Sequence, residues 1–356
     1  MKILILTPNL HCGGAEKVLS LLSKQWKTKK TVIFCLFDIS NQFFIVDTKI
    51  YNLNAAAKNN IFFKFYNYFI RVFNFQKILK KENPDLVISF TESANFVSIL
   101  GCIFAKKRKN LIISVRTNLD HYSIIIRLMA RLLYNLSYQV VVPSSGLEKL
   151  LLNNGIKREK LKVINNPVEF RFNQNDLKNE INIQKPYILA VGRLSKEKGF
   201  ERLIESFSKL NNDVELVFIG EGPEQENLER QCQLLNIENR VKFLGFLKDL
   251  QNYYKGARFL ALTSYYEGWP NVILEAMSFK CPVIAFDCDF GPREIMQNYI
   301  NGILVEKGNI KLFTKEMEKL LSDNNLHSKL SKNAFKRAKD FNLDTISKQW
   351  LQLLRN

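Results

Sequence analysis

The sequence contains no segment of the kind that anchors a chain in a membrane or directs it out of the cell. Among its 356 residues there is no run of about eighteen apolar side chains, which a membrane-spanning helix requires. The chain enters a strand pattern at once, from Ile3 to Leu6, without the cleavage region of a signal peptide. We therefore expect a cytoplasmic protein without a transmembrane helix.

Signatures of metal binding and of nucleic-acid binding are missing as well. The cysteines lack paired metal-ligand spacing and are typical of reduced, mostly buried thiols in a cytoplasmic protein. They lie scattered in or beside apolar runs, as Cys12, Cys35, Cys102, Cys232, Cys281 and Cys288. No helix-turn-helix, zinc or RNA-binding signature occurs. We expect neither a resident metal nor nucleic acid as the partner.

Positive charge, by contrast, is abundant, and it is concentrated in one half. The net charge is +18, from 52 Lys and Arg against 34 Asp and Glu. From Met1 to Val168 there are 25 basic and 9 acidic residues, a balance of +16. From Glu169 onward there are 27 and 25, a balance of +2. The first half is therefore expected to meet an acidic partner.

The length and the order of segments predict two α/β domains. A chain of 356 residues exceeds one ordinary hydrophobic core. Strand-like apolar runs alternate with helical stretches, which predicts a doubly wound parallel sheet in each half. The predicted strands are Ile3–Thr7, Val32–Phe37, Leu86–Ser89, Leu111–Val115, Val140–Val142 and Leu161–Ile164, then Ile188–Val191, Glu215–Ile219, Val241–Leu244, Phe259–Thr263 and Val283–Phe286. The polar stretch from Asn165 to Lys185 is the predicted linker.

Two predicted helices of the first half combine apolar faces with basic residues. Between Asn60 and Lys81 the polar residues form one narrow stripe, and aromatic residues fill the rest of the surface. These are Phe62, Phe63, Phe65, Tyr66, Phe69, Phe73 and Phe75. The segment Ile124–Leu136 carries Arg127 and Arg131 one turn apart on an otherwise apolar surface, and residues 106–109 read Lys-Lys-Arg-Lys.

Two interpretations of these helices stay open. Such a helix covers the sheet of its own domain, or it dips its first half into a membrane interface, where aromatic and basic residues are favoured together. Under the second interpretation, the acidic partner is an anionic lipid surface. Nucleic acid is the alternative partner, without a signature to support it.

The stretch from Glu267 to Glu275 carries the strongest functional signal. It follows the predicted strand Phe259–Thr263 and reads as a polar loop followed by a helix that Asn271 can cap. The N-terminus of such a helix carries about half a positive charge and suits a phosphate. The carboxylate of Glu275 would repel a phosphate but could accept hydrogen bonds from the vicinal hydroxyls of a sugar. The pair of glutamates therefore suggests a nucleotide-sugar site, although two helical glutamates are also compatible with simple solvation.

Two glycine-containing loops follow other strands. Gly192 to Gly199 brings Arg193 and Lys198 to the end of a strand, where an open α/β sheet places its ligand. The two cations could neutralise a diphosphate, or they could be solvated loop residues. Gly13 and Gly14 lie at another strand-to-helix turn, where they let backbone amides approach a ligand or simply form a tight turn.

Five of these motifs occur in the order of a known family. They are Gly13-Gly14-Ala15-Glu16, the Gly192-Arg193…Lys198-Gly199 loop, Gly220-Glu221-Gly222-Pro223, Phe243-Leu244-Gly245 and Glu267-Gly268…Asn271…Leu274-Glu275-Ala276. In this the chain resembles the retaining glycosyltransferases of family 4, most strongly from Tyr187 to Val305. Among them it looks most like bacterial enzymes that build surface polysaccharide, capsule, lipopolysaccharide or lipid-linked oligosaccharide.

The resemblance implies an architecture. Family members have the GT-B fold, with two facing Rossmann-like domains and the donor site in the cleft. It implies an N-terminal acceptor domain over residues 1–167, a nucleotide-sugar-binding domain over 168–329, and a C-terminal helix over 330–356 that crosses back to the first domain.

The resemblance also implies roles for single residues. Arg193 and Lys198 would bind the donor diphosphate as it leaves, and Glu267 would bind the hydroxyls of the transferred sugar. Cations and a helix N-terminus can stabilise the negative charge of the leaving diphosphate as a divalent ion would, so no metal is expected. For the rest of the donor site, the resemblance implies that Glu275 would bind the ribose. Phosphate would contact Gly192 and the backbone amides of Asn271 and Val272. The base would lie near Phe243 and Leu244, and the first domain would close over the donor at Gly13 and Gly14.

Two positions depart from the family pattern. Many relatives place a sugar-contacting histidine where this chain has Arg116, and His121 lies nearby. Either residue could take that role, with Arg116 preferred. Asp287-Cys288-Asp289 spells an acidic triplet of the sort that binds metal in the other large glycosyltransferase fold, or it is a loop at the end of a strand.

The sequence therefore predicts a retaining, metal-independent glycosyltransferase on the cytoplasmic face of the inner membrane. The donor would be a nucleoside diphosphate hexose or N-acetylhexosamine, with uridine as base, and no other cofactor is expected. The acceptor would be a lipid-linked glycan. A nucleotide-sugar epimerase of the same fold and a non-catalytic module that binds sugars or membranes are the alternatives.

Overall fold

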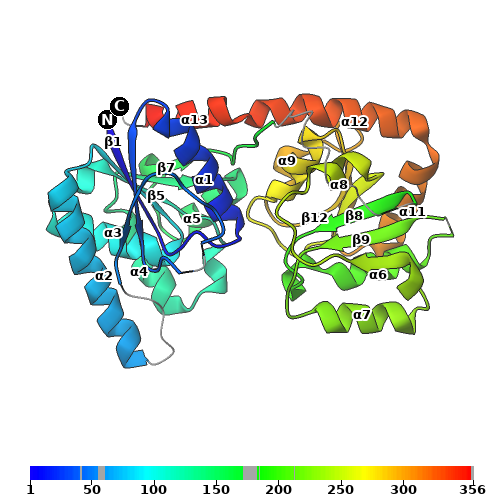
Figure 1. Cartoon of the computed structure of the whole chain (residues 1–356), viewed down its shortest axis with the longest axis horizontal. Coiled ribbons are helices and arrows are strands. Elements are labelled where there is room, and N and C mark those ends of the chain that lie inside the picture. Colours follow the sequence, from blue (N-terminus) through cyan, green and yellow to red (C-terminus); the bar gives the residue numbers. More distant parts are fainter. Residues whose placement is uncertain (41, 55–60, 171–182, 184, 212, 354–356) are drawn as a thin grey trace. The chain divides into compact units, whose positions relative to one another are not determined.

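The computed structural model describes residues 1–40, 42–54, 61–170, 183, 185–211 and 213–353, and their side chains except those of 61–65 and 121. The chain forms two compact units (Figure 1). Unit 1 is Met1–Pro167 with Leu343–Asn356, and unit 2 is Val168–Asn342. Most of the predicted linker, residues 171–182, lies outside the described residues. In the part of the chain that is described, no helix is both long enough and apolar enough to span a membrane.

Unit 1 is built on a seven-stranded parallel sheet with the order β3-β2-β1-β4-β5-β6-β7. Its strands are β1 (Lys2–Thr7), β2 (Thr31–Leu36), β3 (Lys49–Asn52), β4 (Leu86–Phe90), β5 (Leu111–Ser114), β6 (Gln139–Val142) and β7 (Leu161–Val163). The inner strands are continuous apolar runs because helices cover a parallel sheet on both faces. The edge strand β3 was not predicted, since its four residues are only partly buried or exposed.

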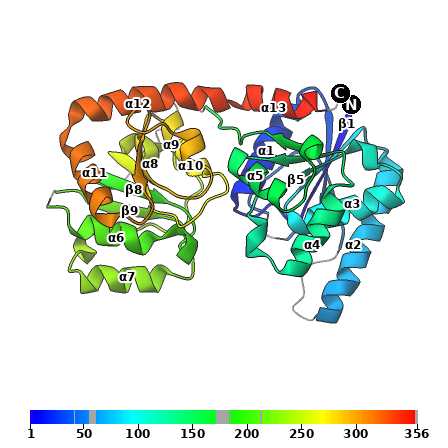
Figure 2. The ribbon, with the colours of Figure 1, turned by 180° about the vertical axis from the view of Figure 1, so that it is seen from behind.

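Helices cover both faces of this sheet (Figures 1 and 2). They are α1 (Gly14–Lys27), α2 (Ile61–Glu82), α3 (Glu92–Phe104), α4 (Ile124–Tyr134), α5 (Ser145–Asn153) and α13 (Leu343–Gln352). One face packs against α1 and α13, where Trp350 stacks on Phe90 with ring centroids 5.6 Å apart. Helix α3 packs against β1, β4 and β5, with α2 and α4 as its neighbours.

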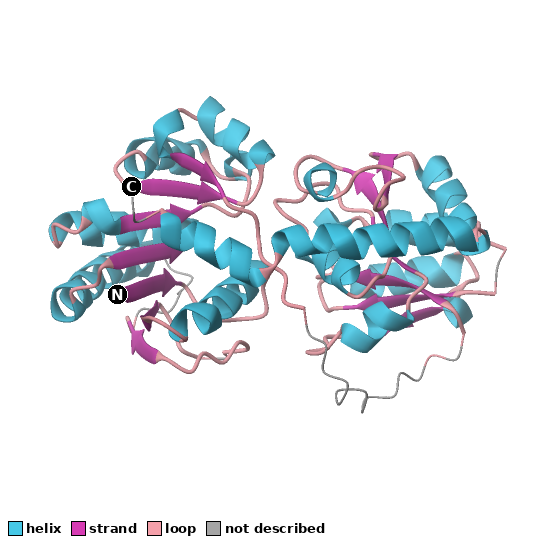
Figure 3. Cartoon of the chain, turned by 90° about the horizontal axis from the view of Figure 1, so that it is seen from above, coloured by secondary structure: helices cyan, strands magenta, loops and turns pink. Residues whose placement is uncertain are grey.

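Unit 2 repeats the plan with a six-stranded parallel sheet of order β10-β9-β8-β11-β12-β13. Its strands are β8 (Tyr187–Val191), β9 (Glu215–Ile219), β10 (Val241–Phe243), β11 (Phe259–Leu262), β12 (Val283–Asp287) and β13 (Ile303–Glu306). Its helices are α6 (Phe200–Ser208), α7 (Gln225–Leu234), α8 (Gln251–Gly256), α9 (Asn271–Ser278), α10 (Pro292–Ile295), α11 (Ile310–Ser322) and α12 (Asn324–Ala338). One face packs on α6, α7, α11 and Leu330 of α12, and the other on α8, α9, α10 and the rest of the buried side of α12. Helices lie on both sides of the strands in Figure 3.

The strand orders fix where each unit can hold a ligand. In unit 2 the chain adds β9 and β10 on one side of β8, and then β11 to β13 on the other. In unit 1 it adds β2 and β3 beside β1, and then continues on the other side with β4. Such a reversal opens a crevice at the carboxyl ends of the two central strands. The crevices therefore lie above β8 and β11 in unit 2, and above β1 and β4 in unit 1.

The C-terminal segment differs from the single helix expected over residues 330–356. It consists of α12 and α13, separated by a short turn at Lys339–Phe341. The backbone N–H of Val168 donates to the carbonyl of Phe341 at 2.8 Å. The segments through which the chain enters and leaves unit 2 therefore run side by side, and α13 belongs to unit 1.

All six cysteines lie in the described residues, and they divide into one exposed and five buried thiols. Cys12 is exposed in the loop before α1. Burial raises the pKa of each buried thiol, those of Cys35, Cys102, Cys232, Cys281 and Cys288. Five buried thiols of six confirm the prediction that the cysteines are mostly buried, and their reduced state stays a prediction.

A buried carboxylate holds the amino-terminal edge of the sheet of unit 1 together. Glu82, at the end of α2, pairs with Lys49 at 2.7 Å and with Lys2 at 3.1 Å, and it accepts a hydrogen bond from Tyr51. The hydrogen bonds from Lys49 and Tyr51 lower the pKa of Glu82 to about 2. The carboxylate thereby ties α2 to β1 and β3.

Glu82→Gln should lower the melting temperature of the protein, because the amide cannot pair with two lysines. The folded-state pKa of Glu82 lies below the ordinary 4.5, so its contribution is complete above about pH 4.5 and is lost as pH falls toward about 2. The difference in melting temperature between wild type and variant should narrow over that range. Glu159→Gln, at an exposed position of unit 1, is the control. A difference that does not change with pH would contradict this account.

Candidate active site

The loops that follow β8 and β11 pack directly on each other at the crevice of unit 2. Gly199 has φ +58°, and a Cβ there would overlap the carbonyl oxygen of Thr263, so the position requires glycine. The Thr263 hydroxyl donates to the carbonyl of Lys198 at 3.3 Å, and the Tyr265 N–H donates to the carbonyl of Glu197 at 2.9 Å. These contacts bring Lys198 next to the loop that carries Glu267.

Lys198 and Glu267, 69 positions apart, form an ion pair in this crevice. The Lys198 Nζ lies 2.7 Å from Glu267 Oε1, and the side chains are 22% and 9% exposed. Burial alone would lower the pKa of Lys198, but the charge of Glu267 and its hydrogen bond together raise it. The lysine is therefore a firmly charged cation at neutral pH.

A buried serine completes this arrangement. The Ser264 hydroxyl donates to the same Oε1 of Glu267 at 2.7 Å, and Ser264 is fully buried. Two donors on one oxygen fix the orientation of the carboxylate and leave Oε2 to other partners. Sequence reasoning missed Ser264, although its position three residues before Glu267 was an available signal.

Glu275 is held from the neighbouring helix. It lies in the second turn of α9, and the hydroxyl of Tyr254, from α8, donates to its Oε2 at 3.2 Å. Burial, with the charge of Glu275, raises the pKa of Tyr254 well above its ordinary value. Tyr254 therefore remains a protonated donor, and its ring stacks on Phe279 with centroids 6.0 Å apart. Sequence reasoning also missed this partner of Glu275.

The start of α9 corrects the predicted cap. Asn271 is the first residue of the helix and Pro270 is the N-cap, which supplies no side-chain hydrogen bond. The prediction that Asn271 caps the helix was therefore wrong by one position. Proline at the cap fixes the entry of the chain but has no acceptor side chain. The loop after β12 supports this turn, because a Cβ on Gly291 would overlap the Pro270 ring.

The acidic triplet on that loop is occupied by protein cations. Asp287 accepts two hydrogen bonds of 2.8 Å from Arg293, and Asp289 lies 3.3 Å from the Nζ of Lys307. The Asp289 carbonyl also accepts a long bond of 3.4 Å from the N–H of Glu267. The triplet thus serves as the structured end of β12. Over the described residues, no cluster of three His, Cys, Asp or Glu side chains has the geometry of a metal site.

Arg193 lies in the loop after β8, which is built on close glycine contacts. A Cβ on Gly220 would overlap the carbonyl oxygen of Gly192, and a Cβ on Gly222 that of Leu194. The loops after β8 and β9 therefore meet backbone to backbone. The guanidinium of Arg193 is exposed and makes no hydrogen bond or ion pair with the described residues. It is thus available to a ligand.

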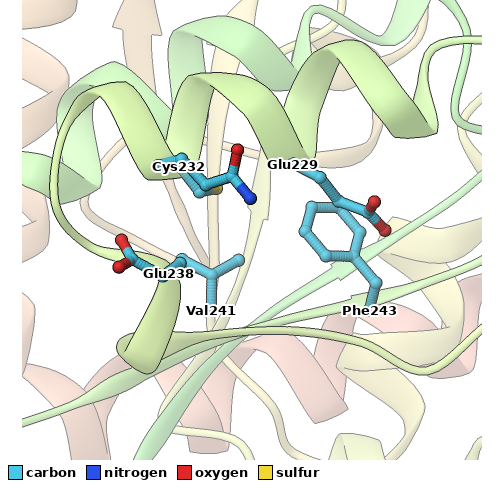
Figure 4. A pocket seen from close by; sticks show the side chains of 6 residues that line it. Glu229, Cys232, Glu238, Val241 and Phe243 are labelled. Atoms are coloured by element: carbon cyan, nitrogen blue, oxygen red, sulfur yellow. The ribbon is translucent and has the colours of Figure 1, made fainter.

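Phe243 and Leu244 face opposite sides of the sheet. The ring of Phe243 stacks on Phe218 with centroids 4.9 Å apart, on the side covered by α7. There it lines a cavity of about 310 Å³ with residues of α7 (Figure 4). Leu244 packs in the other core, and its N–H donates to the carbonyl of Phe218 at 3.0 Å. A contact with the base at this position would use backbone groups, and it stays a prediction.

In unit 1, the predicted glycines lie at the start of α1. Gly13 is the N-cap and Gly14 the first helical residue. The carboxylate of Glu16 lies so close to Gly13 that a Cβ there would overlap it. Burial raises the pKa of Glu16, against the opposing effects of a backbone hydrogen bond and of His11. The part of Gly13 and Gly14 in domain closure stays a prediction.

Arg116 lies at the end of β5, packed against aromatic rings. Its guanidinium lies 4.2 Å from the ring centroid of Phe90, and its Nη1 donates to the side chain of Asn166. Nε and Nη2 are buried and have no partner among the described residues. Burial lowers the pKa of Arg116 to about 9, which leaves it charged at neutral pH. Its catalytic role stays a prediction, and the side chain of His121 lies outside the described residues.

Comparison with known proteins agrees with this geometry. Residues 12–172 match the family described as Glycosyltransferase Family 4, and residues 172–337 match the family described as Glycosyl transferases group 1. The chain belongs to the family 4 glycosyltransferases. This confirms the resemblance drawn from the five motifs.

Several relatives of this glycosyltransferase are named as bacterial enzymes of glycan synthesis. It is 27% identical to a Campylobacter jejuni N-acetylgalactosamine-N,N'-diacetylbacillosaminyl-diphospho-undecaprenol 4-alpha-N-acetylgalactosaminyltransferase, over 99% of each chain. It is 27% identical to the lipopolysaccharide 1,6-galactosyltransferase of Salmonella typhimurium, over 87% of this chain and 86% of the other. The structure of Anabaena HepE in complex with UDP-glucose aligns with a TM-score of 0.87 at 24% identity, over 100% and 99% of the chains. The predicted GT-B fold is confirmed.

The ion pair in the crevice can be tested by a double-mutant cycle. Lys198→Met should lower the free energy of unfolding by roughly 1–3 kcal/mol, because it strands the buried carboxylate of Glu267. Adding Glu267→Leu should cost less than the sum of the two single changes. Lys209→Met, which breaks an exposed pair with Glu205, is the control and should cost less than about 1 kcal/mol. Additive effects at Lys198 and Glu267 would show that the pair is not coupled.

Proposed function

We propose that this glycosyltransferase moves a hexose or an N-acetylhexosamine from UDP to a lipid-linked glycan in the synthesis of surface polysaccharide, lipopolysaccharide or lipid-linked oligosaccharide. The observation that carries the proposal is the ion pair of Lys198 with Glu267, in the loop that leads into α9 of unit 2. A cation for phosphate and a carboxylate for hydroxyls, side by side, match a sugar nucleotide.

The diphosphate would be held by Arg193, Lys198 and the first amides of α9, at Asn271 and Val272. An ammonium group has three donors, and Lys198 uses one on Glu267, so it can bind phosphate without releasing that pair. As the bond between sugar and phosphate breaks, negative charge grows on the leaving UDP. Cations already in position stabilise that charge with little rearrangement. This arrangement supports departure of UDP without a divalent ion.

The two glutamates would bind the hydroxyl groups of the sugar and of the ribose. Each carboxylate is fixed by a protein hydroxyl, Glu267 by Ser264 and Glu275 by Tyr254. Each retains acceptor capacity, since an ionised carboxylate can accept about four hydrogen bonds. We assign Glu267 to the transferred sugar and Glu275 to the ribose, with retention of the anomeric configuration, as the family resemblance implies.

The names of similar proteins support the choice of donor and acceptor. Anabaena HepE, which shares the fold, was crystallised with UDP-glucose and with UDP and glucose. The Campylobacter relative is named for an acceptor carried on diphospho-undecaprenol, and the Salmonella relative for lipopolysaccharide. We therefore favour uridine as the base and a lipid-carried glycan as the acceptor.

The donor assignment predicts activity with UDP-sugars in a panel of UDP-, GDP- and ADP-hexoses and N-acetylhexosamines. Arg193→Ala and Glu275→Ala should each lower kcat/KM for the donor about ten- to hundredfold, since each removes charge-assisted hydrogen bonds. Arg230→Ala and Glu226→Ala, at exposed positions on α7, are the matched controls. Turnover that is untouched in the first two variants would refute the site. A changed sugar on UDP, without release of UDP, would indicate the epimerase instead.

A membrane surface on unit 1 is the second part of the proposal. The outward stripe of α4 is apolar and exposed: Ile124, Ile125, Leu128, Met129 and Leu132. On α2, Tyr66, Phe69 and Phe73 are exposed, and both helices pack on α3. The aromatic residues Phe62, Phe63 and Phe65 lie outside the described side chains. An unpartnered apolar stripe with basic residues nearby is typical of a helix that lies in a lipid interface.

The charge of unit 1 favours an anionic bilayer as the occupant of this surface. Lys106, Arg108 and Lys109 are exposed at the end of α3, and Arg131 is exposed on α4. Anionic lipid attracts such residues by about 1 kcal/mol each. We propose peripheral binding at the cytoplasmic face of the inner membrane, where a lipid-linked acceptor resides.

Liposome flotation tests this surface. The protein should float with vesicles that contain phosphatidylglycerol, and poorly with vesicles of phosphatidylcholine alone. Ile125→Asp and Leu132→Asp should abolish flotation, because each puts a charge where the acyl boundary would be. Leu234→Asp is the control, since Leu234 is an equally exposed leucine (77%) on α7 of unit 2. Equal recovery with both lipids would remove the electrostatic argument.

A further inference from the structure

A polar cluster lies at the carboxyl edge of the sheet of unit 1, outside the residues assigned so far. Strands β4 and β5 end side by side, with Phe90 paired to Ser114. Thr91 follows β4 and Glu92 is the first residue of α3, whereas Thr117 and Tyr122 lie in the segment after β5. The edge of β4 borders the crevice that the strand order opens between β1 and β4.

Glu92 is the centre of this cluster. It is 8% exposed, and its Oε1 and Oε2 accept hydrogen bonds from Thr117 at 2.7 Å and from Tyr122 at 3.0 Å. No described cation forms an ion pair with it. A buried carboxylate without an ion pair is costly, and a neutral glutamine could hold the same two hydroxyl groups by accepting from one and donating to the other. The negative charge at this position therefore calls for a role beyond fixing the loop.

The residue before Glu92 has a strained backbone. Thr91 has φ +75° and ψ 155°, a conformation that a β-branched residue rarely adopts. Its hydroxyl is buried and has no partner among the described residues. Backbone strain of this kind is found where a site needs a particular geometry. Here it fixes the turn that presents Glu92.

The neighbouring arginine does not use Glu92. The negative charge of Glu92 acts to raise the pKa of Arg116, against the effect of burial. The guanidinium nevertheless donates to Asn166 and packs on Phe90. The two acceptor positions that Thr117 and Tyr122 leave on Glu92 thus remain for a ligand. A ligand that donates two neighbouring O–H groups fits, whereas a phosphate would be repelled.

We propose that Glu92, Thr117 and Tyr122 form the subsite that binds a pyranose of the acceptor glycan. Neighbouring hydroxyls of the sugar donate to Glu92, and the hydroxyl groups of Thr117 and Tyr122 complete the hydrogen bonds. This inference rests on the proposed transfer of a sugar to a glycan, and it names the residues of unit 1 that recognise that glycan.

The test uses octyl glycosides of glucose, galactose, N-acetylglucosamine and N-acetylgalactosamine, on the full chain. Saturation-transfer NMR measures their binding directly, and release of UDP from the active donor measures their use as acceptors. Tyr122→Phe and Glu92→Gln should weaken binding of the glycoside, and raise its KM, by about tenfold, the effect of losing one hydrogen bond to a charged group. Their KM for the donor in acceptor-free hydrolysis should stay within about twofold.

Controls separate a subsite from a structural role. Tyr138→Phe alters a half-buried tyrosine of the same unit and should not change either KM. Tyr122 is also half-buried, so its variant tests the subsite even if Glu92→Gln impairs folding. Equal effects on the donor and the glycoside would assign the cluster to stability alone.

The outcomes also separate this inference from the proposed function. Glycoside binding that depends on Tyr122, without any turnover, would support the subsite and refute the transfer reaction. Turnover with unchanged glycoside KM in both variants would refute the subsite and leave the transfer reaction intact. Failure of every glycoside to bind wild-type protein would overturn the subsite.

Discussion

The candidate donor site depends on one buried ion pair, that of Lys198 with Glu267. Each residue alone would be expensive to bury, because an unpaired charge loses its hydration. Together they stay charged in a crevice with little exposure, and Ser264 fixes the shared oxygen. The pair is possible only because β8 and β11 are neighbours in the sheet and Gly199 lets their loops touch. Strand order, a glycine and a charge pair are thus parts of one arrangement.

The two units use the same architectural principle for different chemistry. In unit 2, cations and a helix start accompany the carboxylates at the crevice, which suits a charged nucleotide. In unit 1, Glu92 accepts hydrogen bonds from hydroxyl groups, and the nearby Arg116 forms no ion pair with it, which suits neutral sugar hydroxyls. A glycosyltransferase needs both kinds of site. Part of the positive charge of the first half lies away from Glu92, on the exposed residues Lys106, Arg108 and Lys109 at the end of α3.

Much of the fold could be predicted from the sequence, because buried parallel strands are continuous apolar runs between glycine-rich turns. The edge strands β3 and β13 escaped prediction: β3 (Lys49–Asn52) has no buried residue, and β13 (Ile303–Glu306) alternates buried and less buried positions. The predicted cap at Asn271 was wrong because proline took that position. Local patterns identify elements better than their ends.

The candidate site was predictable only in part. Charged residues and glycines can be recognised in a sequence motif, as Lys198 and Glu267 were. Among the hydroxyl groups that support them, Ser264 lies only three residues before Glu267, but the other partners come near only when the chain folds. Tyr254 lies on a different helix from Glu275, and Thr117 lies 25 positions from Glu92. Nothing in the spacing of these residues distinguishes them from ordinary core or loop residues.

The uneven burial of the cysteines has a practical consequence. Five thiols are buried with raised pKa values and would react slowly, whereas Cys12 is exposed immediately before the Gly13–Gly14 turn. A maleimide fluorophore would therefore attach at one native position, with no engineered cysteine. The emission of the fluorophore would report on the turn at the start of α1 when sugar nucleotides are added, in a protein that carries no mutation.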